Sequence, residues 1–227
     1  MKSCNCVGCE LKTLFFQSVD AMDIETMCAK KSEKAYRKGD VIIQEGQDIK
    51  EFTYLKSGLV KLYRKGSNQK EQILCFAMPL DFVSLLSIFS EEKYNYSVTA
   101  LLDSVTCSMD LSEIRMLAEQ NGKFATGMMQ KINKATDRII LDFLEVKQRR
   151  LFGRIAYILL YFSNEIFKQP SFDLPVSRKE IAEYIGMTVE NVIRTLSDLR
   201  KDGIIKIYGQ TIEIVDMERL TRISELS

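Results

Sequence analysis

The amino-acid sequence predicts an α+β fold that consists of an antiparallel β-barrel or roll, one long helix, and a small C-terminal domain with helices and a β-hairpin. Three observations support this prediction. Short apolar segments separated by glycine corners fill the first half of the chain, an apolar stripe runs from about residue 123 to 146, and two helices followed by two adjoining strands occupy residues 177–215. Apolar residues recur every two positions in strands and every 3.6 in helices, which separates the two kinds of segment.

Between Tyr36 and Leu111 the chain alternates short strands with tight corners. Gly39, Gly46 and Gly58 each follow a polar residue at such a corner. Strands of this length and spacing are typical of an antiparallel barrel or roll. The segments with strand character are 41–43, 52–55, 59–63, 72–76 and 97–108.

A long helix is predicted from about Lys123 to Val146. Its apolar residues recur at intervals of three, four or seven, which is the pattern of a coiled coil. The alternative is a helix that packs against its own β-domain, in which case the second apolar face, formed by Met129, Ile140 and Leu144, needs cover. The predicted stripe consists of Met128, Ile132, Ile139, Phe143 and Val146.

The C-terminal segment has the local signals of two helices joined by a turn. Ser177 is a helix N-cap with Glu180 three positions later, and Gly186 ends that helix. A second helix follows from about Thr188 to Lys201. Strands at 204–208 and 211–215 then flank a two-residue loop whose first residue is Gly209. This order of elements predicts a winged helix-turn-helix that binds duplex DNA.

The outward face of the second helix has the chemistry to read bases. Val192, Leu196 and Leu199 form its apolar face, so that Val189, Glu190, Ile193, Arg194 and Ser197 face outward. A glutamate accepts from the cytosine N4 amine, and an arginine donates to guanine O6 and N7. The alternative for Glu190 and Arg194 is an i, i+4 ion pair exposed to solvent.

The run from Ser177 to Arg194 resembles the CRP/FNR superfamily of bacterial transcription regulators. The resemblance implies that Glu190, Ile193 and Arg194 read the bases. Val189 resembles the residue that the oxygen-sensing branch of the family has at this position, whereas the cyclic-AMP branch tends to have arginine there. Ile193 departs from both branches, and an aliphatic side chain favours a thymine methyl group. The full set of expected DNA contacts is Arg178, Lys179, Thr188, Val189, Glu190, Ile193, Arg194, Lys201 and Lys206.

The runs 38–46 and 57–63 resemble the cyclic-nucleotide-binding β-roll, a double-stranded β-helix, which is the sensor module of the same superfamily. The resemblance implies three parts: a sensor at 1–122, a long dimerisation helix and hinge at 123–148, and a DNA-binding domain at 149–227. In the family the long helices pair across a two-fold axis, which places two recognition helices about 34 Å apart. A homodimer on a palindromic operator follows. Activation would add a contact with RNA polymerase.

The resemblance does not extend to the ligand chemistry. Members that bind a cyclic nucleotide hold the ribose with Gly-Glu and the phosphate with Arg-Ser. The matching positions here are Val83-Ser84 and Tyr94-Asn95, so the phosphate has no cation and cyclic AMP is not expected. The alternatives are a pocket for an apolar or aromatic effector and an ordinary core. The candidate pocket residues are Phe82, Val83, Ser84, Leu85, Tyr94, Asn95 and Tyr96.

Three of the six cysteines lie together at Cys4, Cys6 and Cys9. Their spacing resembles the N-terminal cysteine group of the oxygen-sensing branch, which binds an iron-sulfur cluster with a fourth cysteine. Phe15 stands where that pattern has its third cysteine; Cys28, Cys75 and Cys107 are the candidates for the fourth ligand. The alternatives are a thiol redox switch and an N-terminal segment without a site. Cys75 and Cys107, considered alone, are expected to be buried core thiols.

Composition excludes several other classes. The chain has no histidine, which excludes histidine-based catalysis and histidine-ligated haem, and it has no phosphate-binding glycine loop. We therefore expect no enzyme. The net charge is only +1, but residues 147–206 contain 11 Lys and Arg against 7 Asp and Glu. No apolar run reaches the ~18 residues of a membrane span, so a cytoplasmic protein is expected. Two other functions stay open: a winged helix that docks protein, and a cysteine-ligated redox sensor.

Overall fold

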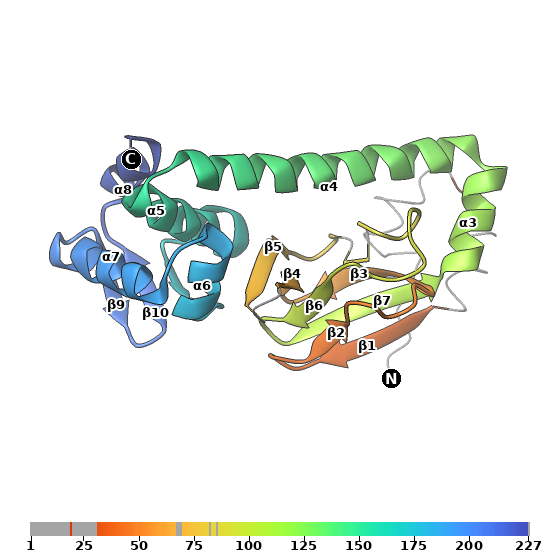
Figure 1. The fold of residues 1–227 in the computed structure, drawn as a ribbon, viewed down its shortest axis with the longest axis horizontal. Helices are drawn as coiled ribbons and strands as arrows, with labels where there is room; N and C mark the ends of the chain where they lie inside the picture. The colour runs from red at the N-terminus through yellow and green to blue at the C-terminus, as the bar shows by residue number, and fades with distance from the viewer. Residues whose placement is uncertain (1–18, 20–30, 67–69, 82, 85, 227) are drawn as a thin grey trace. The chain divides into compact units, whose positions relative to one another are not determined.

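The computed structural model describes Val19 and residues 31–66, 70–81, 83–84 and 86–226. It divides into two compact units (Figure 1). One comprises Met1–Arg64 with Cys75–Arg138, and the other Lys65–Leu74 with Ile139–Ser227. Among the described residues no helix is long and apolar enough to cross a membrane. The predicted α+β fold class is confirmed.

Two antiparallel sheets form the β-roll. One has the strand order β1-β7-β3 and the other β2-β6-β4-β5. Antiparallel pairing matches the short strands and tight corners of the sequence. The strands are β1 (Ser32–Tyr36), β2 (Val41–Ile43), β3 (Glu51–Ser57), β4 (Val60–Lys65), β5 (Glu71–Ala77), β6 (Ser97–Ala100) and β7 (Ser104–Asp110).

The two faces of the β1-β7-β3 sheet differ in character. Phe52 and Tyr54 of β3 point to one face and belong to an apolar cluster with residues of helices α3 (Leu111–Gln120) and α4 (Gly122–Gln148). Thr53 lies between them in sequence and opposite Ser108 of β7, and therefore points to the other face. The sheet thus packs its apolar side against the helices and turns a polar side inward.

The segment 97–108, predicted as one strand, forms two. The chain bends at Leu101–Asp103, where the backbone N–H groups of Leu101 and Leu102 both donate to the carbonyl oxygen of Leu59, at 2.8 and 3.2 Å. The Asp103 carboxylate accepts a hydrogen bond from the Lys38 backbone at 2.9 Å. These bonds redirect the chain, so that β6 and β7 enter different sheets. The sequence analysis also missed β1, α3 and two C-terminal elements named below.

The long helix was predicted at nearly the observed bounds, but its predicted stripe is corrected. Met128 and Val146 are buried, and Ile132 is packed against the core cluster of the β-roll. These side chains are covered by their own chain and do not offer a seam to a second helix. The exposed apolar side chains of this helix share only Phe143 with the predicted stripe: Met129, Ile140, Leu141, Phe143 and Leu144.

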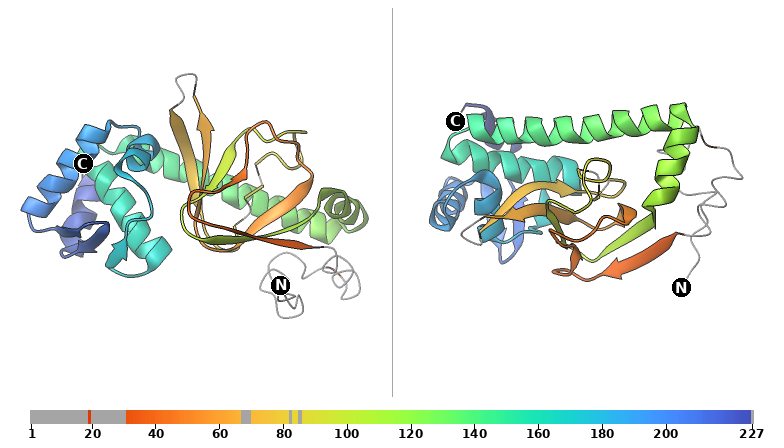
Figure 2. Two further views of the ribbon diagram at one scale, coloured as in Figure 1. Left: turned by 90° about the horizontal axis from the view of Figure 1, so that it is seen from below. Right: turned by 45° about the vertical axis from the view of Figure 1, so that its right-hand side comes forward.

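The C-terminal unit places helices over a three-stranded antiparallel sheet of order β8-β10-β9 (Figure 2). Its buried residues include Ile155 and Leu159 from the first helix and Leu220 from the last. β8 and α8 were not predicted. The elements are α5 (Leu151–Tyr161), the π-helix η2 (Phe162–Phe167), β8 (Ser171–Asp173), α6 (Arg178–Ile185), α7 (Val189–Lys201), β9 (Ile205–Tyr208), β10 (Thr211–Ile214) and α8 (Met217–Leu226).

Gly39 and Gly58 have similar backbone conformations, but we expect their replacement by alanine to lower the stability of the protein by different amounts. Gly39 has φ +94° and open space where a Cβ would lie, whereas an added Cβ at Gly58 (φ +99°) would clash with the Ser104 hydroxyl and lie 2.7 Å from the Asp103 carbonyl oxygen. We expect Gly39→Ala to lower the free energy of unfolding by about 1 to 2 kcal/mol. Gly58→Ala should cost a further ~1 to 3 kcal/mol, because the clash includes backbone.

Urea denaturation of both variants measures the difference. Equal losses for Gly39→Ala and Gly58→Ala would contradict the close approach of Gly58 to the bend at 101–103.

Candidate DNA-binding interface

The turn between α6 and α7 has the geometry that the sequence predicted. The Ser177 hydroxyl accepts a hydrogen bond from the Glu180 backbone at 3.2 Å, and the Glu180 carboxylate accepts one from the Ser177 backbone at 2.8 Å. This capping box satisfies two backbone N–H groups at the start of α6. Gly186 ends the helix at φ +68°, a left-handed conformation that glycine adopts without steric cost. The chain therefore turns sharply before α7.

Helix α7 is strongly amphipathic, which decides the side chains that it presents to solvent. Val192, Leu196 and Leu199 are buried. Glu190, Ile193 and Arg194 lie on the exposed face, where Ile193 has 55% of its surface exposed. Thr188 caps the helix by accepting a hydrogen bond from the Asn191 backbone at 3.3 Å. Val189, at the first position of the helix, is half-buried.

The two charged residues of this face are not paired with each other. The Arg194 guanidinium donates to the Asn191 side-chain oxygen at 3.1 Å, and within the described part of the chain no ion pair joins it to Glu190. The backbone N–H of Glu190 and the Thr188 hydroxyl hold the pKa of Glu190 below its usual value. Glu190 is therefore an ionised hydrogen-bond acceptor, and both groups point to solvent with capacity for a ligand.

Each of the other predicted basic contacts has an acidic neighbour or is partly buried. Lys179 lies 3.8 Å from Glu183, Lys201 3.5 Å from Asp198, and Lys206 3.6 Å from Glu213. The three lysine side chains are 71%, 70% and 52% exposed, so these ion pairs are weak. Arg178 is half-buried, and burial lowers its pKa.

The sequence analysis missed two residues of this surface. Tyr208 ends β9 with 60% of its surface exposed, and Asn191 orients Arg194. The period of two in β9 identifies Tyr208, because Ile205 is buried and Lys206 is exposed. Asn191 carried no comparable signal, since its hydrogen bond depends on the rotamer of Arg194.

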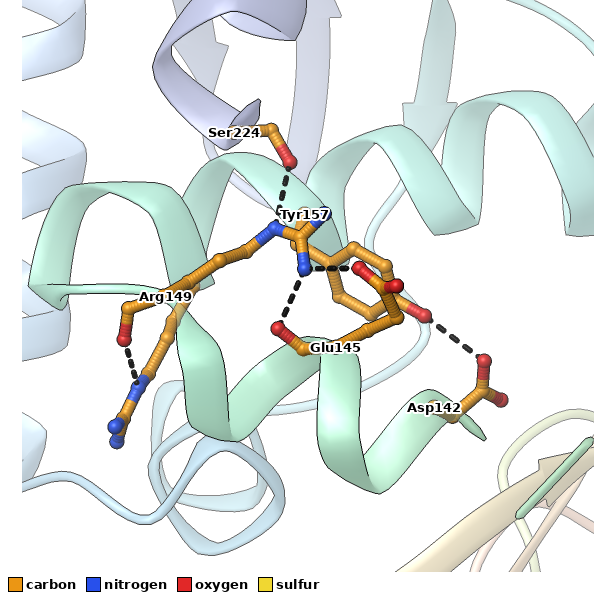
Figure 3. Close-up of polar contacts among 6 residues, drawn as sticks. Asp142, Glu145, Arg149, Tyr157 and Ser224 are labelled. Atoms are coloured by element: carbon orange, nitrogen blue, oxygen red, sulfur yellow. Dashed lines mark hydrogen bonds and ion pairs between the residues drawn. The ribbon is translucent and has the colours of Figure 1, made fainter. Parts of the chain in front are cut away.

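A polar network fixes the start of the C-terminal unit (Figure 3). Arg149 stacks on the Tyr157 ring at 4.8 Å, donates to the Ser224 hydroxyl at 3.2 Å and pairs with Glu145. The Tyr157 hydroxyl donates to Asp142 at 2.8 Å. Burial, with this hydrogen bond to Asp142, raises the pKa of Tyr157, so the phenol stays a donor. The network joins the end of α4 to α5 and α8.

A further arginine links this junction to the helix-turn-helix. The Arg154 side chain donates to the Arg149 carbonyl oxygen at 2.8 Å and to the Ile185 carbonyl oxygen at 3.0 Å. Ile185 is the last residue of α6, whose terminal carbonyl groups have no partner within the helix. Arg154 therefore ties the end of α4 to the turn that precedes α7.

Several polar groups of the predicted effector residues already have hydrogen-bond partners within the β-roll. The Tyr96 hydroxyl donates to the Val83 carbonyl oxygen at 3.0 Å, and the Ser84 hydroxyl bonds both polar groups of the Thr53 backbone. Tyr94 and Tyr96 form an edge-to-face pair, whereas Asn95 is exposed. Phe82 and Leu85 lie outside the described residues, as do Cys4, Cys6, Cys9 and Cys28.

Two domain models match the sequence. The cyclic nucleotide-binding domain matches residues 33–121, and the Crp-like helix-turn-helix domain matches residues 153–223. The first covers the β-roll with α3, and the second covers the unit that contains α6, α7 and the hairpin. The matches thus agree with the division of the chain into a β-domain and a helical domain.

Relatives align over nearly the whole chain. Electron transport regulator A of Shewanella oneidensis is 26% identical over 95% of this chain and 88% of its own length. An anaerobic regulatory protein of Pasteurella multocida is 27% identical over 85% of this chain and 71% of its own. The structure of FixK2 from Bradyrhizobium japonicum shares the fold, with a TM-score of 0.75 and 24% identity over 85% of this chain and 96% of that one. The chain belongs to the CRP/FNR superfamily of bacterial transcription regulators.

Proposed function

We propose that the protein is a homodimeric, sequence-specific transcription regulator, that it binds a palindromic operator, and that its ligand is not cyclic AMP. The observation that carries the proposal is the exposed face of α7. It combines an ionised acceptor, a donor and an apolar side chain at positions 190, 194 and 193. These are the groups that read cytosine, guanine and the thymine methyl group in the major groove.

The proposal assigns different roles to the two kinds of contact. Glu190, Ile193 and Arg194 meet base edges, and Lys179, Lys201 and Lys206 meet phosphates. Base contacts determine sequence preference, whereas phosphate contacts strengthen binding to every duplex. Tyr208 at the end of the wing has an exposed ring that can pack against the sugar-phosphate backbone.

Replacement of Arg194 by alanine should weaken binding to the preferred operator by about 1 to 3 kcal/mol per half-site and relax the preference at one base pair. The physical reason is the loss of the bidentate donor to guanine. Fluorescence anisotropy with the operator selected from random duplex DNA, and with a scrambled duplex, measures both effects.

Arg200→Ala is the matched control, because Arg200 is an exposed arginine on another face of the same helix. It should change the affinity for both duplexes little. Lys206→Ala should weaken both alike and reduce the salt dependence. An equal loss on operator and scrambled DNA for Arg194→Ala would contradict base reading. Binding that does not weaken with added salt, or no DNA binding at all, would favour a winged helix that docks protein.

The exposed apolar face of α4 supports the homodimer. Met129, Ile140 and Phe143 are 63%, 51% and 59% exposed. They recur at heptad positions a and d, together with Asn133 and Thr136. Large apolar side chains that recur along one helix face are costly to leave in water, and a second copy of the helix covers them.

Ile140→Asp should convert the dimer to a monomer, because it places a charge in the proposed seam. Leu141→Asp is the matched control: Leu141 is also exposed, at 59%, but it lies about 100° round the helix from Ile140. Size-exclusion chromatography with light scattering determines the mass of each variant. A dimeric Ile140→Asp protein, or a monomeric Leu141→Asp protein, would contradict this assignment.

The N-terminal cysteines stay a prediction. Of the candidates for a fourth cluster ligand, Cys75 and Cys107 are 5% and 1% exposed, and Cys107 packs in the apolar cluster beside Phe52. Both are placed as core thiols, which does not favour a cluster that uses them. Iron analysis and the visible spectrum of protein purified without oxygen distinguish a cluster from a reversible thiol switch. A colourless protein whose DNA binding does not respond to oxidation has neither.

A further inference from the structure

We propose that the β-roll binds a small zwitterion, of the size of an α-amino acid, in a cavity between its two sheets. This inference rests on the proposed role of the β-roll as the sensor of a DNA-binding regulator. Of the predicted effector-pocket residues that the structure describes, Tyr94 alone lines this cavity. The lining comes from β1, β2, β3, β7 and the adjoining loops: Lys34, Tyr36, Ile42, Ile43, Gln47, Asp48, Lys50, Glu51, Thr53, Tyr94 and Ser108.

The size of the cavity limits the ligand. Its volume is about 180 Å³. A cavity of about 150 Å³ holds one benzene molecule, so this one holds roughly six to nine non-hydrogen atoms. A cyclic nucleotide has more than twice that number of non-hydrogen atoms, so most of it would extend beyond the cavity into solvent.

The floor of the cavity contains a buried hydroxyl pair. Thr53 and Ser108 are 5% and 3% exposed, and their hydroxyl oxygens lie 2.8 Å apart. Two hydroxyl groups carry two protons, and the bond between them uses one. In the part of the chain that the structure describes, the other proton has no acceptor. A buried donor without an acceptor is costly, and a carboxylate oxygen in the cavity would satisfy it.

Tyr94 lines the same cavity with an aromatic ring and a hydroxyl group. Its hydroxyl donates to the Glu51 carbonyl oxygen at 3.3 Å. Burial, with a smaller contribution from the Glu51 charge, raises the pKa of Tyr94 to about 12. The phenol therefore stays neutral, and Ile43, which is 3% exposed, provides the apolar surface beside it.

The rim of the cavity offers both signs of charge. Lys34 lies 3.6 Å from Glu51, and Lys50 lies 3.9 Å from Asp48. These ion pairs are long and solvent-exposed, so they contribute little and can be exchanged. A ligand with a single charge would leave the opposite charge of a pair without a partner. A zwitterion supplies both, with its ammonium group toward a carboxylate and its carboxylate toward a lysine.

The experiment is a binding screen on the full-length protein without DNA. Each of the twenty standard amino acids is added separately, and thermal unfolding and calorimetry detect binding. We expect one or a few of the smaller amino acids to raise the unfolding midpoint. The N-acetyl and carboxamide derivatives of the binder each remove one charge and should bind about tenfold or more weakly.

Two variants test the location. The double variant Thr53→Val/Ser108→Ala should weaken binding about five- to tenfold, because it removes both hydroxyl donors, whereas either single variant leaves one hydroxyl proton for the ligand. Thr106→Val is the matched control, because Thr106 is buried on the same face of β7 but does not line the cavity. The affinity of the Thr106→Val protein for the amino acid should stay within about twofold of that of the original protein. Binding by no amino acid, equal binding of the charge-removed derivatives, or equal losses in both variants would overturn the site.

The link to DNA binding is tested separately. The bound amino acid should change the affinity for the selected operator, and the Thr53→Val/Ser108→Ala protein should require a correspondingly higher amino-acid concentration. A bound amino acid that leaves the affinity for the operator unchanged would overturn the regulatory role and leave the site standing. Absence of DNA binding with intact ligand binding would overturn the proposed function instead.

Discussion

The burial of one face of α7 is the constraint on which the rest of the DNA-binding surface depends. Val192, Leu196 and Leu199 must leave water, and their position in the sequence determines which way the helix is turned. Because these residues are buried, the helical period places Glu190 and Arg194 on the face that is exposed to solvent. The capped helix α6 and the left-handed Gly186 then determine where α7 begins.

The polar junction around Arg149 extends this constraint to the long helix. Arg149 contacts the Tyr157 ring, Ser224 and Glu145 (Figure 3). Arg154 connects Arg149 to the end of α6. A change in the angle between α4 and α5 must break several of these contacts together. Since α4 is one continuous helix from Gly122 to Gln148, it contributes residues to both units.

The sequence predicted best what short-range chemistry decides. A capping box, a glycine at a helix end and a two-residue hairpin loop are complete within a few residues, and all three are present in the structure. Long-range packing was harder to predict. The long helix has apolar residues on more than half of its circumference, and the sequence does not state which of them the β-roll covers. The predicted stripe therefore included Met128 and Val146, which their own chain buries.

The cavity likewise depends on long-range contacts that the sequence does not reveal. Thr53 and Ser108 are 55 residues apart, and only the register of β3 on β7 brings their hydroxyl groups together. Serine and threonine residues in a strand give no sequence signal of a binding site, because they are common on exposed faces of sheets. Tyr94, by contrast, was predicted as a pocket residue from its position relative to a known family pattern.

In the proposed complex, two copies of α7 read the two halves of a symmetric operator. Selection of bound sequences from a pool of random duplex DNA measures whether they do. We expect a two-fold symmetric motif whose half-sites are centred about 34 Å, roughly ten base pairs, apart. Recovery of no enriched sequence, or of a single half-site without a symmetric partner, would contradict it.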